Sequence, residues 1–319
     1  MRDHGGNIDQ AAKRFGRLDW IDLSTGINRN PFTPAPLSHH ALTALPTRAD
    51  EARLCQNAAT LYGCRADEVL PLAGASAGIQ LLPHEIAGQR AAVLSPTYNE
   101  HAASLRASGW QVAEVPTVDA LAGADLAVIV NPNNPDGREW TPAQIAAIAA
   151  TVGHLIVDES FTDPRPDLSV IPTRPANVTV LRSFGKFWGL AGLRLGFAIG
   201  APDLLAGIAR RAGPWSVSGP ALEIGAAALQ DREWALDTVV MLSETSLYLD
   251  RIVTAHGWAL EGGTHLFRLY RVADATAARD QLARAGIWSR IFPARPDWIR
   301  LGIPADLAEF QRLQAALEG

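Results

Sequence analysis

The stretch from Ser183 to Gly196, SFGKFWGLAGLRLG, places a lysine where covalent chemistry is favoured. Lys186 stands among aromatic and glycine residues, three positions after Ser183. A lysine that forms a Schiff base with an aldehyde must lose its proton, and dry surroundings favour the neutral amine. Ser183 and Arg194 add a hydroxyl and a fixed positive charge, a pair suited to a phosphate monoester. The stretch therefore predicts a reactive lysine beside a phosphate-binding position.

A second chemical group ends an apolar strand pattern upstream, in Leu155-Ile-Val-Asp158-Glu-Ser-Phe161. A buried carboxylate opposite a lysine–aldehyde adduct suits the pyridinium nitrogen of pyridoxal phosphate (PLP), which acts as an electron sink while it is protonated. Each motif alone has an ordinary explanation, because Lys186 could be a surface lysine and Asp158 could cap the next element. Their order along the chain favours a PLP site, with Lys186 and Asp158 as its catalytic residues.

A loop of small residues, Leu72–Gly78, could hold the rest of the cofactor phosphate. It opens a helical pattern, so the backbone N–H groups of Ala75 and Ser76 can face an anion at a helix N-terminus. Such loops often only turn the chain. Together with Ser183 and Arg194, this one predicts a complete phosphate site.

Two further residues follow predicted strands, where ligands bind in open α/β sheets. Tyr98 ends Ser95-Pro-Thr-Tyr98 and could stack on a pyridine ring, or could be a half-buried aromatic residue at a strand end. Asn134 lies in NPNNPDG, a rigid segment that could fix an amide beside the ring's phenolic oxygen, or could serve only as a turn. Both residues are predicted cofactor contacts.

The composition excludes several classes of protein. The chain has 319 residues, 48% of them hydrophobic, and a net charge of −5 without a basic block, so we expect no nucleic-acid partner. Two cysteines, Cys55 and Cys64, indicate neither a metal site nor a disulfide framework. No apolar stretch reaches membrane length and the N-terminus lacks a signal-peptide pattern, so we expect a cytoplasmic protein without a membrane partner.

The middle of the chain alternates short apolar strands with helical patterns, as in a mostly parallel sheet covered by helices. Thr141–Val152 is the clearest helix, with Thr141 as N-cap and Pro142 as its first residue. Pro-rich Asn30–Pro36 is predicted to cross between lobes. We predict strands at Ala91–Ser95, Gln111–Val115, Leu126–Asn131, His154–Asp158, Thr179–Ser183 and Leu195–Gly200.

The end of the chain predicts a compact α+β lobe. A long helical pattern runs from about Pro220 to His256. After it we predict strands at Trp258–Leu260, Leu266–Tyr270, Ile287–Ile291 and Trp298–Leu301, and helices at Ala273–Ala285 and Ala305–Leu317.

In combination, NPNNPDG, VDES and SFGKFWGLAGLRLG resemble the PLP-dependent aminotransferase superfamily of fold type I, class I/II, over almost the whole chain. The resemblance implies an α/β fold, with a large domain around a mostly parallel, seven-stranded-type sheet and a small α+β C-terminal domain. It also implies a homodimer. We place an N-terminal segment that packs at the active site at 1–35, the large PLP-binding domain at 36–215 and the small domain at 216–319.

The resemblance also assigns roles. It implies a Schiff base at Lys186, a pyridine contact from Asp158, a ring-oxygen contact from Asn134 and ring stacking by Tyr98. Phosphate contacts fall to Ala75, Ser76, Ser183 and Arg194. In Trp298-Ile-Arg300-Leu-Gly, Arg300 matches the family's substrate-carboxylate arginine, and its fork suits a carboxylate, although a surface arginine on an edge strand would look the same.

Within the family, three features are similar to the threonine-phosphate decarboxylase branch of cobalamin biosynthesis. They are HGGNI at 4–8 with DLSTGIN at 22–28, PWSVS at 214–218, and Phe161 where aminotransferases usually carry a tyrosine. Relatives fold the N-terminal segment over the active-site mouth, so His4, Asn28 and Arg29 are candidates for binding the substrate phosphate. Asn28 could instead contact the carboxylate, and His4 could belong to a disordered terminus.

Two departures from the family pattern affect what can be transferred. Leu45 replaces a tyrosine that in many relatives reaches the neighbouring subunit's cofactor phosphate, and the C-terminal lobe looks trimmed. The resemblance implies decarboxylation of L-threonine O-3-phosphate to aminopropanol phosphate, with histidinol-phosphate aminotransferase as the alternative enzyme. A PLP-fold module without turnover is disfavoured by the intact lysine, aspartate and arginine.

Overall fold

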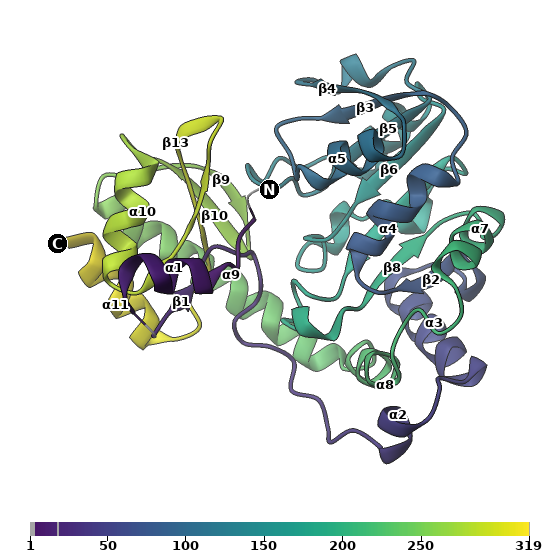
Figure 1. The fold of residues 1–319 in the computed structure, drawn as a ribbon, viewed down its shortest axis with the longest axis horizontal. Coiled ribbons are helices and arrows are strands. Elements are labelled where there is room, and N and C mark those ends of the chain that lie inside the picture. Colours follow the sequence, from purple (N-terminus) through teal and green to yellow (C-terminus); the bar gives the residue numbers. More distant parts are fainter. Residues whose placement is uncertain (1–3, 18, 319) are drawn as a thin grey trace. The chain divides into compact units, whose positions relative to one another are not determined.

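The structure is a computed structural model that describes residues 4–17 and 19–318. Its contacts group the chain into two units (Figure 1). Unit 1 comprises Met1–Pro31, Pro135–Arg138 and Ala235–Gly319, and unit 2 comprises Phe32–Asn134 and Glu139–Trp234. The predicted domain boundaries stay a prediction. The contact-based division falls at 31/32 and 234/235 instead of 35/36 and 215/216.

Unit 2 contains a seven-stranded sheet in the order β2-β8-β7-β6-β5-β3-β4. All neighbouring pairs from β7 to β4 are parallel, whereas β8 runs antiparallel to both β7 and β2. The mostly parallel sheet predicted from the sequence is therefore confirmed. Its strands are β2 (Val69–Leu72), β3 (Arg90–Leu94), β4 (Gln111–Val115), β5 (Leu126–Val130), β6 (His154–Asp158), β7 (Val178–Ser183) and β8 (Gly196–Ile199).

Helices cover both faces of this sheet, because alternate residues of its central strands are buried on either side. Val128 and Ile156 join a cluster with residues of α4 (Ala75–Leu81), α5 (Glu100–Ala107) and α7 (Pro202–Ala212). Ile129 and Val157, which point the other way, are also fully buried. The other helices of the unit are α2 (His39–Thr43), α3 (Arg48–Tyr62), α6 (Pro142–Ala149) and α8 (Gly219–Ala228), of which α3 contacts β2 and α6 contacts β6.

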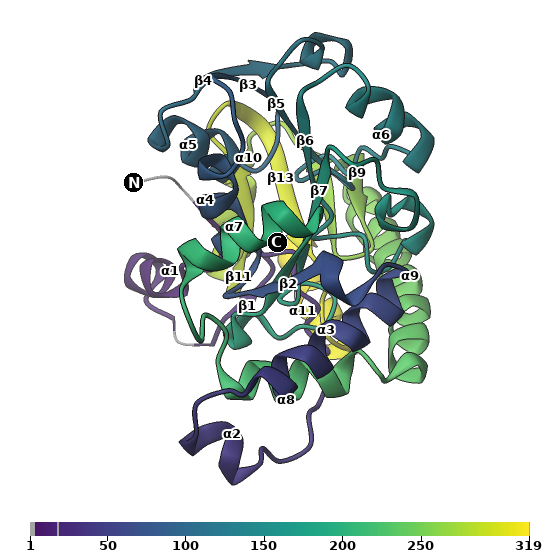
Figure 2. The same cartoon turned by 90° about the vertical axis from the view of Figure 1, so that its right-hand side faces the viewer.

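The topology brings the predicted cofactor residues to one edge of the sheet. Strands β3, β5, β6 and β7 lie parallel and side by side, so they end at the same edge (Figure 2). Because β8 is antiparallel, its first residue, Gly196, pairs with both Leu72 and Ser183, the last residues of β2 and β7. The segments after β2, β3, β5, β6 and β7 and the segment before β8 therefore meet at this edge.

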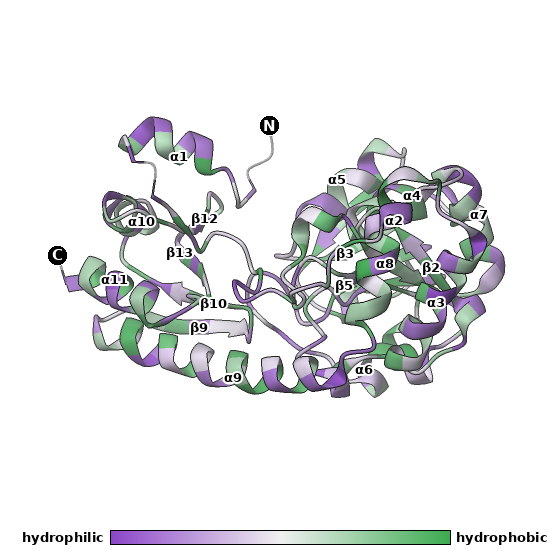
Figure 3. Cartoon of the chain, turned by 90° about the horizontal axis from the view of Figure 1, so that it is seen from below, coloured by the Kyte–Doolittle hydropathy of each residue, from purple (hydrophilic) through white to green (hydrophobic). Residues whose placement is uncertain are grey.

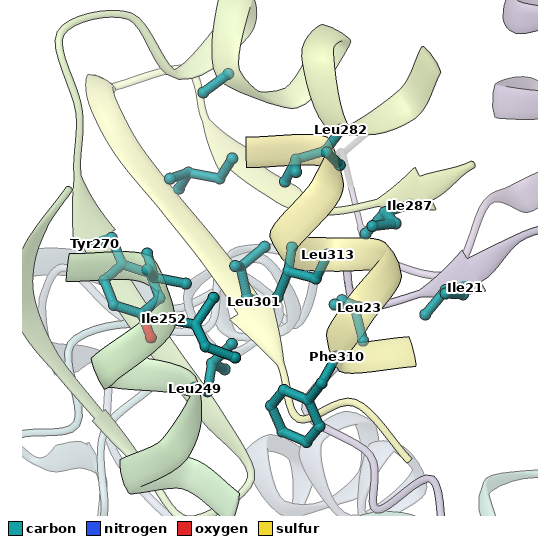
Figure 4. Close-up of a cluster of buried hydrophobic side chains, with 14 of the residues drawn as sticks. Ile21, Leu23, Leu249, Ile252, Tyr270, Leu282, Ile287, Leu301, Phe310 and Leu313 are labelled. Carbon is teal, nitrogen blue, oxygen red and sulfur yellow. The ribbon is translucent and has the colours of Figure 1, made fainter. Parts of the chain in front are cut away.

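Unit 1 combines an antiparallel sheet with four helices in its described residues, one of which begins in unit 2. The sheet order is β12-β13-β10-β9, and a short parallel pair joins β1 to β11. The buried side chains of Leu249, Tyr270, Leu301, Phe310 and Leu313 pack together between these elements (Figure 4). The elements are α1 (Ile8–Phe15), β1 (Ile21–Asp22), α9 (Arg232–Ala255, which begins in unit 2), β9 (Ala259–Thr264), β10 (Phe267–Arg271), α10 (Ala275–Arg284), β11 (Ile287–Trp288), β12 (Arg290–Phe292), β13 (Arg295–Gly302) and α11 (Leu307–Glu318).

Most predicted elements are confirmed, with two corrections. The strand predicted at Ile287–Ile291 is divided into β11 and β12, which belong to different sheets. Thr141 caps α6 and Pro142 is its first residue, as predicted. A single helix from Pro220 to His256 is wrong, because the chain leaves the helical path after Ala228 and restarts at Arg232. Along α9, polar and apolar residues alternate (Figure 3), which is the periodic pattern that made the region look continuous. Among the described residues, no helix combines the length and apolarity needed to cross a membrane.

Candidate active site

An anion cradle lies where β2 ends and α4 begins. Gly74 has φ +82°, and a Cβ atom placed on it would lie 2.7 Å from Nη2 of Arg194, so the guanidinium rests directly over this glycine. A Cβ on Gly196 would collide with the backbone N of Ala75, so that glycine allows β8 to approach the start of α4. Free N–H groups at a helix start and an arginine together suit a phosphate. Arg194 therefore lies beside the start of α4, and the phosphate role of Ala75, Ser76 and Arg194 stays a prediction.

Lys186 lies in the loop that follows Ser183 at the end of β7. Its side chain is half-buried, and Nζ lies 5.4 Å from the ring centroid of the buried Phe161. Trp188, which is 1% exposed, stacks on Phe184 with 5.1 Å between ring centroids. This aromatic packing fixes the loop on both sides of the lysine and keeps water away from much of it.

Asp158, the last residue of β6, is buried and accepts several hydrogen bonds. His101 Nε2 lies 2.8 Å from Oδ2 of Asp158, and the backbone N of Ser160 donates to Oδ1 at 2.9 Å. The Ser160 hydroxyl donates to the same oxygen. Burial alone would raise the pKa of the Asp158 carboxyl, but the hydrogen bond and charge of His101 and the donors of Ser160 bring it below its ordinary value. The carboxylate is therefore held in its ionised form.

Tyr98 and Asn134 follow the neighbouring strands β3 and β5. The ring of Tyr98 contacts the ring of His101 edge-on, with 6.1 Å between the ring centroids. His101 in turn contacts Asp158. The loop of Tyr98 and the loop of Asn134 are tied together by Asn133, which donates to Pro96 O at 2.9 Å and accepts from Thr97 Oγ1 at 2.6 Å. Sequence neighbours of both predicted residues thus hold their loops side by side.

A buried charge cluster lies behind the strand ends. Nε of Arg182 lies 3.4 Å from Oε2 of Glu159, and Nη1 of Arg182 lies 3.4 Å from Oδ1 of Asp163. Glu159 also accepts from Ser169 Oγ at 2.7 Å. Because side chains alternate along a strand, Arg182 and Glu159 point away from the face that carries Ser183 and Asp158. Burial raises the pKa of both Glu159 and Asp163 against the opposing pull of Arg182.

In unit 1, a buried arginine pairs with a second arginine on the neighbouring strand. Arg300 on β13 is 6% exposed and is the direct partner of Arg290 on β12. Its Nη2 donates to the carbonyl of Ser24 at 2.7 Å. Burial, followed by repulsion from Arg290, lowers the pKa of Arg300 to about 9, although Asp22 favours the charged form. Arg300 remains charged at neutral pH, and a bound anion would relieve the repulsion between the two guanidinium groups.

The other predicted substrate residues differ in how they are engaged. Asn28 is buried and accepts from the backbone N of Asn30 at 2.9 Å, whereas His4 is exposed. Arg29 donates from two nitrogens to the carboxylate of Glu309, from Nε at 2.9 Å. This pairing already engages the fork of Arg29 inside unit 1, and the phosphate role of Arg29 stays a prediction, as does the carboxylate role of Arg300.

Three groups in these sites escaped prediction from the sequence. His101 follows Tyr98 by three residues and points inward from the first turn of α5, and a buried histidine of that kind leaves no motif. Ser160 stood inside the VDES motif and could have been noticed as an Asx-type partner of Asp158. Arg290 could have been found only through its strand pairing with Arg300.

Comparison with known proteins agrees with this geometry. Residues 19–317 match the model of the family "Aminotransferase class I and II". The chain belongs to this family. It is 43% identical to the threonine-phosphate decarboxylase of Pseudomonas aeruginosa, covering 100% of this chain and 98% of that protein. It is 42% identical to the threonine-phosphate decarboxylase of Sinorhizobium sp, covering 98% and 97%.

A solved structure with the same fold is histidinol-phosphate aminotransferase from Sinorhizobium meliloti in complex with pyridoxal-5'-phosphate. Its TM-score to this chain is 0.84 with 21% sequence identity, over 97% of this chain and 93% of that one. The observed sheet and helices are therefore those of a fold type I PLP-dependent aminotransferase, as predicted.

The residues of unit 2 fit pyridoxal phosphate. The cradle at Gly74 is lined by a guanidinium and a helix start, the chemistry that a phosphate requires. Asp158 offers a buried, ionised carboxylate for a protonated ring nitrogen. Among the described residues, no group of three or more histidine, cysteine or acidic side chains is arranged to hold a metal ion.

Proposed function

We propose that the chain is a PLP-dependent decarboxylase of L-threonine O-3-phosphate, which yields 1-amino-2-propanol phosphate for cobalamin biosynthesis. The observation that carries the proposal is sequence identity to two proteins named threonine-phosphate decarboxylase. The identities are 43% and 42%, over essentially the full length of the chain. The buried Phe161 beside Lys186 supports the same assignment, because no hydroxyl is present there to bond the ring oxygen.

In this proposal, unit 2 holds the cofactor. Lys186 would bind it covalently, and the cradle of Ala75, Ser76 and Arg194 together with Ser183 would hold its phosphate. When bound, PLP supplies an electron sink that weakens the bond at the substrate α-carbon lying perpendicular to its ring. Asp158, kept ionised by His101 and Ser160, would accept a hydrogen bond from the protonated ring nitrogen. Asn134 would be the main protein donor to the ring oxygen, and Tyr98 would pack against the ring.

Lys186 would also move a proton during turnover. Loss of carbon dioxide requires a proton at the α-carbon, and Lys186 in its ammonium form would donate that proton and become the neutral amine. The buried ring of Phe161, whose centroid lies 5.4 Å from Lys186 Nζ, gives the amine one apolar neighbour.

The substrate's anionic groups are assigned to unit 1. Arg300 would hold the substrate carboxylate in a fixed orientation, and Arg290 adds a second positive charge beside it. A threonine phosphate carries two anionic groups, a carboxylate and a phosphate, and the pair of arginines matches such a substrate. Asn28 and His4 are further candidates for contact with the phosphate.

We also propose that the protein acts as a homodimer. Three large apolar side chains are exposed around α2 and the segment before α8: Leu42 is 64% exposed, Leu45 62% and Trp215 58%. Helices α2 and α8 contact each other, so these residues belong to one region of unit 2. A second copy would cover this apolar surface.

The experiment that tests the function compares two substrates on the purified, PLP-loaded protein. Threonine phosphate alone should release carbon dioxide through many turnovers. Histidinol phosphate with 2-oxoglutarate should give no more glutamate than a Lys186→Ala control. Robust glutamate formation without carbon dioxide release would reject the decarboxylase and promote the aminotransferase.

A further inference from the structure

Ser24 joins three separate parts of unit 1 through its own atoms. It is fully buried in the turn after β1. Its carbonyl accepts from Nη2 of Arg300 at 2.7 Å, and its hydroxyl accepts from the backbone N of Gly6 at 2.7 Å. One residue therefore contacts both the arginine on β13 and the segment that precedes α1.

The hydroxyl of Ser24 has a fixed orientation. It donates to Oδ1 of Asp22 at 2.6 Å, and the Ser24 backbone N donates to the same oxygen at 2.9 Å. Because the single hydroxyl proton is committed to Asp22, the oxygen presents its lone pairs to Gly6. The same Asp22 favours the charged form of Arg300. Asp22 and Ser24 thus set both the hydrogen bonding and the charge around Arg300.

The N-terminal segment has the shape that this contact requires. A Cβ atom on Gly5 would collide with the carbonyl oxygen of Ser24, which is the oxygen that Arg300 uses. Gly6 has φ +88°, a backbone conformation that favours glycine. The two glycines are needed for different reasons, and both allow His4–Gly6 to lie against Ser24.

We propose that Ser24 is a positioning residue that couples the N-terminal segment to the substrate-binding arginine. Ser24 holds the guanidinium of Arg300 in the orientation in which it receives the substrate's anionic group, and it fastens His4–Gly6 beside it. Binding of an anion at Arg300 then orders the segment, and an ordered segment improves anion binding. This inference rests on the proposed function, since it assigns the substrate's anion to Arg300.

The test compares Ser24→Ala, Ser24→Thr and Gly5→Ala in the PLP-loaded protein. Ser24→Ala removes the hydroxyl and leaves the carbonyl, while Gly5→Ala displaces the segment and leaves Ser24 intact. Both should raise KM for threonine phosphate roughly threefold to tenfold, the effect of one hydrogen bond, with kcat within about twofold of the wild type. Ser24→Thr keeps a hydroxyl and should restore KM.

Hydrogen exchange supplies a readout that does not depend on turnover. The Gly6 amide should exchange faster in Ser24→Ala than in the wild type. Inorganic phosphate should slow that exchange in the wild type but not in Arg300→Gln. Ser289→Ala is the matched control, because Ser289 is a buried serine of the same unit whose hydroxyl has no hydrogen-bond partner among the described residues.

The outcomes separate this inference from the proposed function. If KM and Gly6 exchange are unchanged in both Ser24→Ala and Gly5→Ala, the coupling is rejected. If Ser24→Ala does not fold, Gly5→Ala decides on the same criteria. A fall in kcat with KM unchanged would also reject it. If the wild type does not decarboxylate threonine phosphate, the proposed function fails, and the phosphate effect on Gly6 exchange still decides the coupling.

Discussion

At the scale of single residues, the site depends on a carboxylate that is buried and yet ionised. Asp158 is 3% exposed, and burial of that kind opposes its charge. His101 and Ser160 counter the effect through direct hydrogen bonds. His101 is therefore the residue outside the motifs whose loss we expect to matter most for the chemistry.

Replacing His101 by leucine should shift the acid limb of the pH–rate profile to higher pH. The variant keeps Asp158 buried but removes a hydrogen bond and a neighbouring charge, so the pKa of Asp158 rises toward the value that burial imposes. A smaller fraction of Asp158 is then ionised at each acidic pH, so kcat should fall most at the acid end of the profile. The measurement is kcat across the pH range in which the wild type is stable.

Tyr98→Phe provides the control for this variant. It keeps the ring that packs edge-on against His101, so the acid limb should stay in place. An unchanged pH profile in His101→Leu would show that His101 does not set the ionisation of Asp158.

The residues that could be read from the sequence are those whose chemistry lies within one continuous stretch. Lys186, Ser183 and Arg194 share one motif, and Asp158 ends an apolar run. His101 and Arg290 could not be recognised, because each acquires its neighbour only through folding, His101 through α5 lying against β6 and Arg290 through strand pairing.

At the scale of elements, the ends of β6 and β7 are joined on the side away from the cofactor residues. Glu159 continues β6, its backbone N donates to Leu181 O at 2.9 Å, and its carboxylate meets Arg182 of β7. Tyr62 of α3 adds its ring 4.5 Å from the Arg182 guanidinium carbon. This buried contact holds Asp158 and Ser183 in register on the other face.

Asp163→Asn should stabilise the protein at alkaline pH. Burial raises the pKa of Asp163 in the folded protein above its value in the unfolded chain. The folded protein therefore gains free energy of unfolding from the protonated Asp163 below the unfolded pKa, and loses this contribution as pH rises through the folded pKa. Asparagine avoids that loss. The free energy of urea unfolding should exceed that of the wild type by about 1 kcal/mol at pH 8, and the difference should shrink as pH falls.

Arg182→Met is the contrasting variant. It leaves two acids without their cation and should lower the free energy of unfolding by about 3–5 kcal/mol. If Asp163→Asn lowered the free energy of unfolding at pH 8, the prediction would be contradicted. Arg182 would then require both Glu159 and Asp163 in their charged forms.

Six of the seven strands of the sheet in unit 2 were predictable to within a residue or two because their apolar runs are bounded by turn residues, as for His154–Asp158. The break between α8 and α9 was not, since Gln230 and Asp231 contain no glycine or proline to mark it. Strand β2 was missed because Pro71 interrupts its pattern, although it pairs fully with β8.

At the scale of the whole molecule, the apolar region around α2 should determine the state of association. Leu45→Asp places a charge where a second copy is proposed to pack, so the variant should elute and scatter light as a monomer at concentrations where the wild type is a dimer. Leu307→Asp is the control, since Leu307 is equally exposed at 63% on α11 of unit 1. A wild type that remains monomeric would contradict the dimer.

The central claim, decarboxylation with return of a proton to the same carbon, is tested most directly by the product formed in heavy water. Threonine phosphate incubated in D2O with the PLP-loaded protein should give 1-amino-2-propanol phosphate carrying one deuterium at the former α-carbon, with an equal amount of carbon dioxide. NMR and mass spectrometry of the product give both quantities. A 2-oxo acid phosphate as product, or a threonine phosphate that merely exchanges its α-hydrogen while keeping its carboxylate, would contradict the assignment.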